Sequence, residues 1–140
     1  MLKIQTTRFG ELEVEEERIL SFPLGIPGFS AAKHFFLIEH KENVWWLQAA
    51  DDADLAFIVT EPFSLFPEYS FKLSDDLEAV LQIDDPQSLV VFAIVSADSS
   101  GACANLRAPI VINSAKLLGA QFLSDDERLS FRTPLPIQKK

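Results

Sequence analysis

The chain has few cysteines and histidines, the residues that form disulfides and bind metal ions in many small proteins. Its 140 residues include one cysteine, Cys103, and two histidines, His34 and His40. A lone cysteine excludes an internal disulfide and is typical of a reducing compartment. The two histidines show none of the compact Cys/His spacings of a tetrahedral zinc site. We therefore expect neither a bound metal nor a cofactor.

Long apolar runs are also missing. The longest uninterrupted run, residues 89–95, is far shorter than the roughly 20 residues that a membrane-spanning helix needs. The first residues, from Met1 to Arg8, lack the apolar core of a signal peptide. These absences predict a cytoplasmic protein without a membrane partner.

Basic residues are in deficit, with 12 Lys and Arg against 21 Asp and Glu, for a formal charge of −9. Such a chain repels a phosphate backbone and offers no basic stripe, so direct nucleic-acid binding is not expected. The acids gather in short clusters, among them residues 51–54 and 75–78. Each cluster is either a solvated turn or part of an acidic face that attracts a basic protein partner.

Aromatic residues are plentiful by contrast. Twelve phenylalanines, spread from Phe9 to Phe131, supply core material along the whole chain. A chain of this length buries enough surface to fold without disulfides or metals. We expect one domain over residues 1–140.

Short alternating segments dominate the pattern. Apolar and polar residues alternate over residues 2–6 and 12–14, on either side of Phe9-Gly10, which predicts a hairpin.

Ser74, Asp75 and Asp76 suit the start of a short amphipathic helix. Pro134 and Pro136 are expected to end regular structure before a basic tail at Lys139 and Lys140. Further strands are predicted at residues 35–39, 44–48, 55–60, 89–95, 102–106, 110–113, 120–123 and 129–133. This order predicts an all-β fold, an antiparallel barrel-like or roll domain with one short helix.

The segment from Asn105 to Asn113 is extended but interrupted by Pro109. Proline donates no ladder hydrogen bond, so the interruption belongs at an edge, a strand start or a bulge. The segment therefore predicts a strand, a kink and a second strand, with Ile110 and Ile112 buried on one face.

Two further features offer apolar side chains to a partner. Residues 25–29 form a tight loop that carries Ile26 and Phe29, which either cover the core or stand exposed as a contact surface. Trp45 and Trp46 are consecutive strand residues and must face opposite ways. One of them is expected in the core and the other in a second layer or a binding surface.

Catalytic patterns are weak. The sequence contains no Gly-x-Ser-x-Gly elbow and no Gly-rich phosphate loop. Carboxylates such as Asp51 and Asp52 are adjacent in sequence, whereas acid/base catalysis needs two carboxyls that face a common substrate. A hydrolase or metal-dependent enzyme that uses clustered carboxylates stays as the alternative to a non-enzymatic binding protein.

Several short strings resemble the FliW family of flagellar assembly factors, and they fall in the order that this family shows. The resemblance covers nearly the whole chain. The strings are Ser21-Phe22-Pro23 with Gly25-Ile26-Pro27-Gly28-Phe29, Leu47-Gln48 before Asp51-Asp52, Leu55-Ala56-Phe57, Pro67-Glu68-Tyr69, the run from Asn105 to Asn113, and Gly119-Ala120-Gln121.

The resemblance implies a barrel-like all-β fold, no enzymatic activity and two protein partners. These are flagellin and the small basic translational regulator CsrA, which the protein antagonises when flagellin has been exported. For the basic partner we expect acids in short loops to make the contact, because exposed charges steer association. For flagellin we expect an apolar receptor. The candidate contact residues are Ile26, Phe29, Trp45, Asp51, Asp52, Asp54, Asp75 and Asp76.

Overall fold

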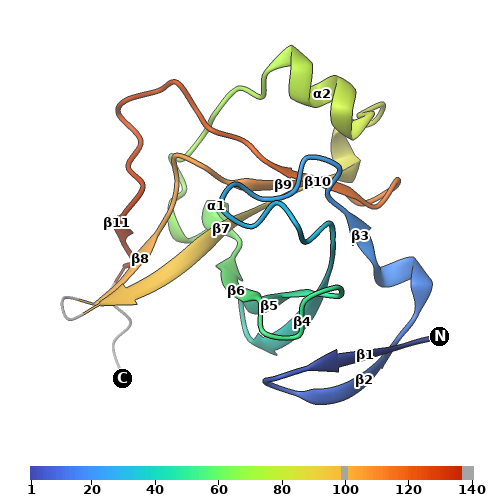
Figure 1. The fold of residues 1–140 in the computed structure, drawn as a ribbon. Helices are drawn as coiled ribbons and strands as arrows, with labels where there is room; N and C mark the ends of the chain where they lie inside the picture. Colours follow the sequence, from blue (N-terminus) through green and yellow to red (C-terminus); the bar gives the residue numbers. More distant parts are fainter. Residues whose placement is uncertain (99–100, 137–140) are drawn as a thin grey trace.

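The computed structural model describes residues 1–98 and 101–136, so the predicted basic tail at Lys139 and Lys140 lies outside the described residues. Within the described part, the chain forms a ring of strands with a separate hairpin on one side and a helix on the other (Figure 1). The barrel-like, mainly β fold expected from the sequence is confirmed.

The hairpin consists of β1 (Leu2–Thr6) and β2 (Gly10–Val14), as the alternation predicts. Its inward residues Ile4 and Val14 pack against Phe36 of β4 (His34–Lys41) on the outer face of the ring. The hairpin is followed by the 3-10 helix η1 (Glu16–Arg18), whose Arg18 side chain donates to the Leu37 carbonyl oxygen. The hairpin therefore packs on the outer face of β4 and covers Phe36.

The ring runs in the order β7, β6, β5, β4, β3, β10, β9, and β9 pairs back with β7 to close it. All its pairings are antiparallel except one, in which Leu118 of β10 lies parallel to Ser21 of β3. The sheet is therefore mixed, and the expected antiparallel arrangement holds for every other pairing of the ring. The remaining ring strands are β3 (Leu20–Ser21), β5 (Val44–Ala49), β6 (Ala56–Thr60), β7 (Leu89–Asp98), β9 (Ile110–Asn113) and β10 (Leu118–Gln121).

The segment around Pro109 behaves as one interrupted strand. β8 (Gly101–Ala104) and β9 both pair with β7, through Val95 opposite Ala104 and Phe92 opposite Ile110. Five residues, 105–109, therefore stand opposite two on β7, which makes a large irregular bulge at the predicted kink. Both faces of β9 are buried, so Ile110 and Ile112 are covered as predicted.

The C-terminal end differs from the prediction. A strand was expected over residues 129–133, but the strand here, β11, is only Thr133–Pro134 and pairs with β8. Residues 122–132 form an irregular segment instead, held by Phe122 N–H to the Pro109 carbonyl and Ser124 N–H to the Arg107 carbonyl. Such bonds tie the segment to the bulge and not to a ladder.

Two α-helices are present among the described residues, where the sequence predicted one. The predicted helix is α2 (Asp75–Leu81), and Ser74 caps it by accepting a hydrogen bond from Leu77 N–H. The additional helix, α1 (Pro62–Leu65), is a single turn with proline at its first position, where the missing N–H costs nothing. A second 3-10 helix, η2 (Pro86–Ser88), leads into β7.

The apolar residues divide between the interior and the outer faces of the ring. Phe22, Phe35, Leu47 and Ile110 are among the fully buried residues of the interior. On the outer face of β9 and β10, Val111 packs with Leu73, Leu81 and Ala120 beneath α2. The fold thus has one central core with smaller cores under the hairpin, under α2 and under the chain that joins α1 to α2.

Candidate functional site

Two loops that carry most of the predicted contact residues meet at one end of the ring. The Asp51 carboxylate accepts a hydrogen bond from Lys33 N–H at 3.0 Å. The Ala50 amide donates to the His34 carbonyl oxygen at 2.7 Å. The rings of Phe29 and Phe57 are in edge contact, with centroids 5.3 Å apart. Residues 22–33 and 50–55 are therefore neighbours, and we call them together the loop end.

The buried side chain of Gln48 shapes the acidic part of the loop end. Its Nε2 lies within hydrogen-bonding distance of carbonyl oxygens of the following turn, at 3.1 Å from Ala49 and 3.2 Å from Leu55. An amide inside the turn holds these carbonyls inward, which leaves the aspartate side chains outside. Gln48 is thus a structural reason why this turn presents acids to solvent.

The acids of the turn differ in their surroundings. Burial would raise the pKa of Asp51, but hydrogen bonds from Lys33 N–H and the His34 ring outweigh it and lower that pKa. Asp52 accepts a bond from Asp54 N–H at 3.1 Å, and Asp54 accepts one from the Thr7 hydroxyl. All three carboxylates are exposed, and they are directed to different partners.

The apolar candidates of the loop end separate into one buried and one exposed residue. Ile26 is only 2% exposed and belongs to the central core, whereas Phe29 is 46% exposed. A bridge between Ile26 and Phe29 closes the turn, and Gly25 holds a positive φ where a Cβ would meet the Ser30 Cα at 2.8 Å. Ile26 therefore covers the core, and Phe29 with the exposed Leu24 supplies the apolar surface of the loop end.

Trp45 and Trp46 face opposite sides of β5, as predicted. Trp45 is half-buried against Phe92 of the central core, at a centroid distance of 5.1 Å. Trp46 lies on the outer face between the hairpin and β4, with the Arg8 guanidinium 4.7 Å from its ring centroid. Trp45 thus packs against the central core, and Trp46 packs on the outer face beside Arg8. Both side chains are half-buried, so Trp45 can present only part of its ring to a partner.

Asp75 and Asp76 lie elsewhere, in the first turn of α2, which packs against β10. Both are exposed, and they stabilise the positive end of the helix. The predicted contact residues thus form two groups, one at the loop end and one at the start of α2.

The titratable side chains of the described residues form no candidate metal centre. Within residues 1–98 and 101–136, no three His, Cys, Asp or Glu side chains are grouped so as to hold a metal ion. Cys103 is buried in β8, and His34 has Asp51 as its neighbour at 3.4 Å. What the loop end offers is a charged rim beside exposed aromatic surface, which suits contact with another protein.

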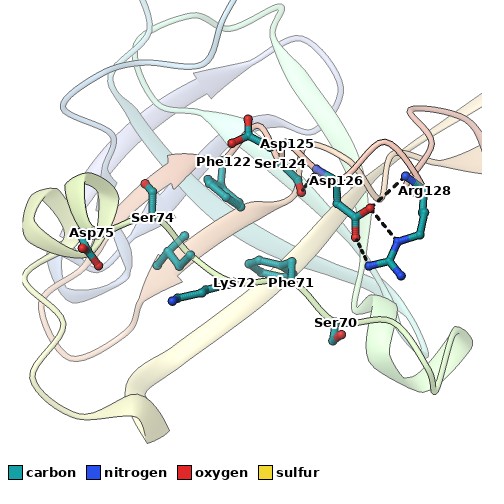
Figure 2. Close-up of a pocket in the computed structure, with 11 residues that line it drawn as sticks. Ser70, Phe71, Lys72, Ser74, Asp75, Phe122, Ser124, Asp125, Asp126 and Arg128 are labelled. Carbon is teal, nitrogen blue, oxygen red and sulfur yellow. Dashed lines mark hydrogen bonds and ion pairs between the residues drawn. The ribbon is translucent and has the colours of Figure 1, made fainter.

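A further surface feature was missed from the sequence. A groove of about 710 Å³ lies between the chain that joins α1 to α2 and residues 122–128 (Figure 2). Phe71 and Phe122 lie in its middle with ring centroids 5.7 Å apart, Asp75 marks one end, and the Asp126–Arg128 ion pair marks the other. The sequence signal for it is the polar–apolar alternation of residues 70–74, which shows that one face is buried but does not indicate a groove.

Comparison with known proteins gives one consistent result. The family model described as FliW protein matches residues 3–135. The flagellar assembly factor FliW of Caldicellulosiruptor bescii is 41% identical over 132 residues, covering 92% of this chain and 87% of that protein. FliW of Desulfitobacterium hafniense is 41% identical over 138 residues, covering 96% and 91%. A crystal structure of the flagellar assembly factor FliW superimposes with a TM-score of 0.91 at 35% identity, covering 99% of this chain and all of that one.

A closed β-ring with whole-length similarity of this kind defines a flagellar assembly factor, a class of proteins that are not enzymes. The chain belongs to the FliW family. The resemblance seen in the sequence is confirmed, and the alternative of a carboxylate-based hydrolase or metal enzyme is set aside.

Proposed function

We propose that this protein binds flagellin and antagonises CsrA in the cytoplasm, so that the amount of unassembled flagellin controls flagellin translation. The carrying observation is its whole-length similarity to flagellar assembly factors. Within the described residues, no helix is both long and apolar enough to cross a bilayer. Flagellin occupies the protein until export removes it, and the freed protein then captures CsrA and relieves repression.

The charge of the chain supports the CsrA branch. A formal charge of −9 attracts a basic regulator, and Asp51, Asp52 and Asp54 form an exposed acidic turn beside Phe29. Exposed charges contribute mainly to the association rate, since they act over a Debye length of about 8 to 10 Å. We assign this turn to the first encounter with CsrA, with the acids of α2 as the second candidate surface.

The antagonism requires that the two partners exclude each other. By linkage, flagellin must weaken CsrA binding by the same free energy by which CsrA weakens flagellin binding. Flagellin titrated into a preformed complex with CsrA is therefore expected to release CsrA. A stable ternary complex at saturating flagellin would contradict the exclusion mechanism even if each partner bound alone.

The encounter surface is tested by stopped-flow association with CsrA at two ionic strengths. Asp52→Lys should slow association and reduce its salt dependence. Glu17→Lys is the matched control, because it changes the net charge equally from an exposed site in η1. Equal slowing by both variants would show that only net charge matters and that the turn is not the contact.

The apolar part of the loop end is tested with a second variant and its matched control. Phe29→Ala is expected to weaken partner binding if Phe29 is an anchor, because truncating an anchoring aromatic costs about 2 kcal/mol or more. Phe131→Ala is the control, since Phe131 is similarly exposed, at 49% against 46%, and lies under Arg107 instead of at the loop end. Unchanged affinities for both flagellin and CsrA would remove Phe29 from the site.

A further inference from the structure

Residues 70–73, which we call the strap, have the side-chain pattern of a β-strand. Ser70 and Lys72 are exposed, Phe71 is half-buried and Leu73 is buried. This alternation is the two-residue period of extended backbone. Phe71 and Leu73 anchor the strap in the small cores on the outer face of the ring.

The strap nevertheless belongs to no ladder. Within the described part of the chain, no backbone N–H or carbonyl of residues 70–73 makes a hydrogen bond, whereas the flanking residues Tyr69 and Ser74 do. Backbone groups that are not bonded internally must be bonded to water or to a ligand. The strap therefore has the side-chain alternation of a strand but no hydrogen-bonded neighbour on either side among the described residues.

Two grooves border the strap. In an extended chain the side chains point above and below, so the N–H and C=O groups point sideways. A groove of about 710 Å³ lies between the strap and residues 122–128, and a second groove of about 530 Å³ is lined by the strap together with residues that include Phe63 and Ile83. Both grooves are lined by the strap itself. The unpaired backbone groups thus border surfaces that are already concave.

The larger groove also has the side chains that a peptide strand requires. Phe71 and Phe122 form an apolar floor, which suits apolar residues at alternate positions of an added strand (Figure 2). Asp75 and Asp125 border it without an ion partner in the described residues, while Asp126 is paired with Arg128 at 3.0 Å. The two unpaired carboxylates favour a partner segment with a basic residue.

We propose that the strap accepts an extended segment of flagellin, which adds as a β-strand in the groove between the strap and residues 122–128. The segment has apolar residues at alternate positions and a basic residue that reaches Asp125. This proposal rests on the proposed function for the identity of the partner. Lys72 at the open edge discourages unselective pairing, because a charged side chain on an edge opposes the addition of unrelated strands.

Residue-resolved amide exchange tests the pairing. Exchange is measured by NMR on the full chain, alone and with saturating monomeric flagellin from the same cell. Alternate residues of a strand direct their N–H groups to the same side. We therefore expect exchange to slow about tenfold or more, as one hydrogen bond allows, at residues 70 and 72 or at 71 and 73, but not at both pairs. Bound flagellin with unchanged or uniformly slowed strap amides would overturn the proposal.

The groove is identified by a matched pair of variants. Asp125→Asn should weaken flagellin binding about two- to fivefold, the range for an exposed ion pair, while Glu127→Gln, on the same segment but not bordering the groove, should change it little. Equal effects of the two variants would overturn the placement in this groove. Failure of flagellin to bind the unaltered protein would overturn the proposed function as well, whereas binding without the alternating protection would overturn the strand pairing alone.

Discussion

Gly119 is the position where a single methyl group should test the packing of the ring most directly. It lies in β10 opposite Ile112 of β9, and a Cβ built on it would stand 2.5 Å from Cζ and 2.7 Å from Cε1 of Phe22. Phe22 cannot yield easily, because it is fully buried and in edge contact with Phe35 at 5.0 Å. Gly119→Ala therefore forces a shift in the central core.

The expected magnitude follows from two opposing effects. Overpacking of a well-packed core costs about 1 to 3 kcal/mol. Replacing glycine in a strand returns up to about 1 kcal/mol, because the unfolded chain loses freedom. Because the contact of 2.5 Å falls on a fully buried ring, we take the upper half of the overpacking range, about 2 to 3 kcal/mol. Less the gain of about 1 kcal/mol, Gly119→Ala should lower the free energy of unfolding by roughly 1 to 2 kcal/mol. Urea denaturation followed by tryptophan fluorescence measures it.

A double-mutant cycle separates the clash from other effects. Phe22→Leu shortens the side chain at the point of contact, so the pair Gly119→Ala and Phe22→Leu should be more stable than the two single losses added together, by about 1 kcal/mol. Strict additivity, or a Gly119→Ala variant as stable as the parent, would refute the argument that the Phe22 ring excludes a side chain here.

The remaining predictions concern stability at three other sites. Ile112→Ala removes a side chain that is 3% exposed in the central core, and it should lower the free energy of unfolding by about 2 to 5 kcal/mol; an unchanged denaturation midpoint would contradict this. Tyr69→Phe leaves the Leu106 carbonyl without the 2.6 Å bond from the Tyr69 hydroxyl, so thermal denaturation should show a loss of about 1 to 3 kcal/mol. The pKa of Asp51 is lowered on folding, so its ionised form stabilises the fold above the ordinary pKa of 3.8, and that contribution is lost as the pH falls through the folded pKa. Asp51→Asn should cost less than about 1 kcal/mol near neutral pH and nothing in strong acid; a difference that persists in acid would have another cause.

The elements that sequence reasoning placed well are those specified by neighbouring residues. The β1–β2 hairpin follows from two alternating segments around one turn, and α2 begins at the Ser74 cap that its own residues specify. The bulge before β9 follows from Pro109, which removes one donor from the ladder. Local chemistry is sufficient in each case, because the required partners lie within a few residues.

The elements that were missed depend on distant partners. β3 is two residues long and exists because Leu20 and Ser21 meet Phe35 and His34 on one side, while Ser21 meets Leu118 on the other. The same is true of Ile26 and Phe29, whose residue types suit either a core or a surface. Only the tertiary packing decides which of them is buried, and it places Ile26 in the central core and leaves Phe29 46% exposed. A sequence pattern reports that a side chain is apolar, but the fold determines which surface covers it.

The strap also shows that a local sequence pattern does not specify distant partners. Residues 70–73 alternate between polar and apolar side chains as a strand does. Phe71 and Leu73 pack in a small core, but the backbone has no hydrogen-bonded neighbour among the described residues. Alternation reports that one face of a segment is buried, and it is silent on the lateral partner, because hydrogen bonding in a sheet is made by groups common to every residue. In β9 the chain itself supplies that partner on both sides. In the strap the described residues supply none, and an unpaired backbone beside a groove is the arrangement that the proposed strand addition requires.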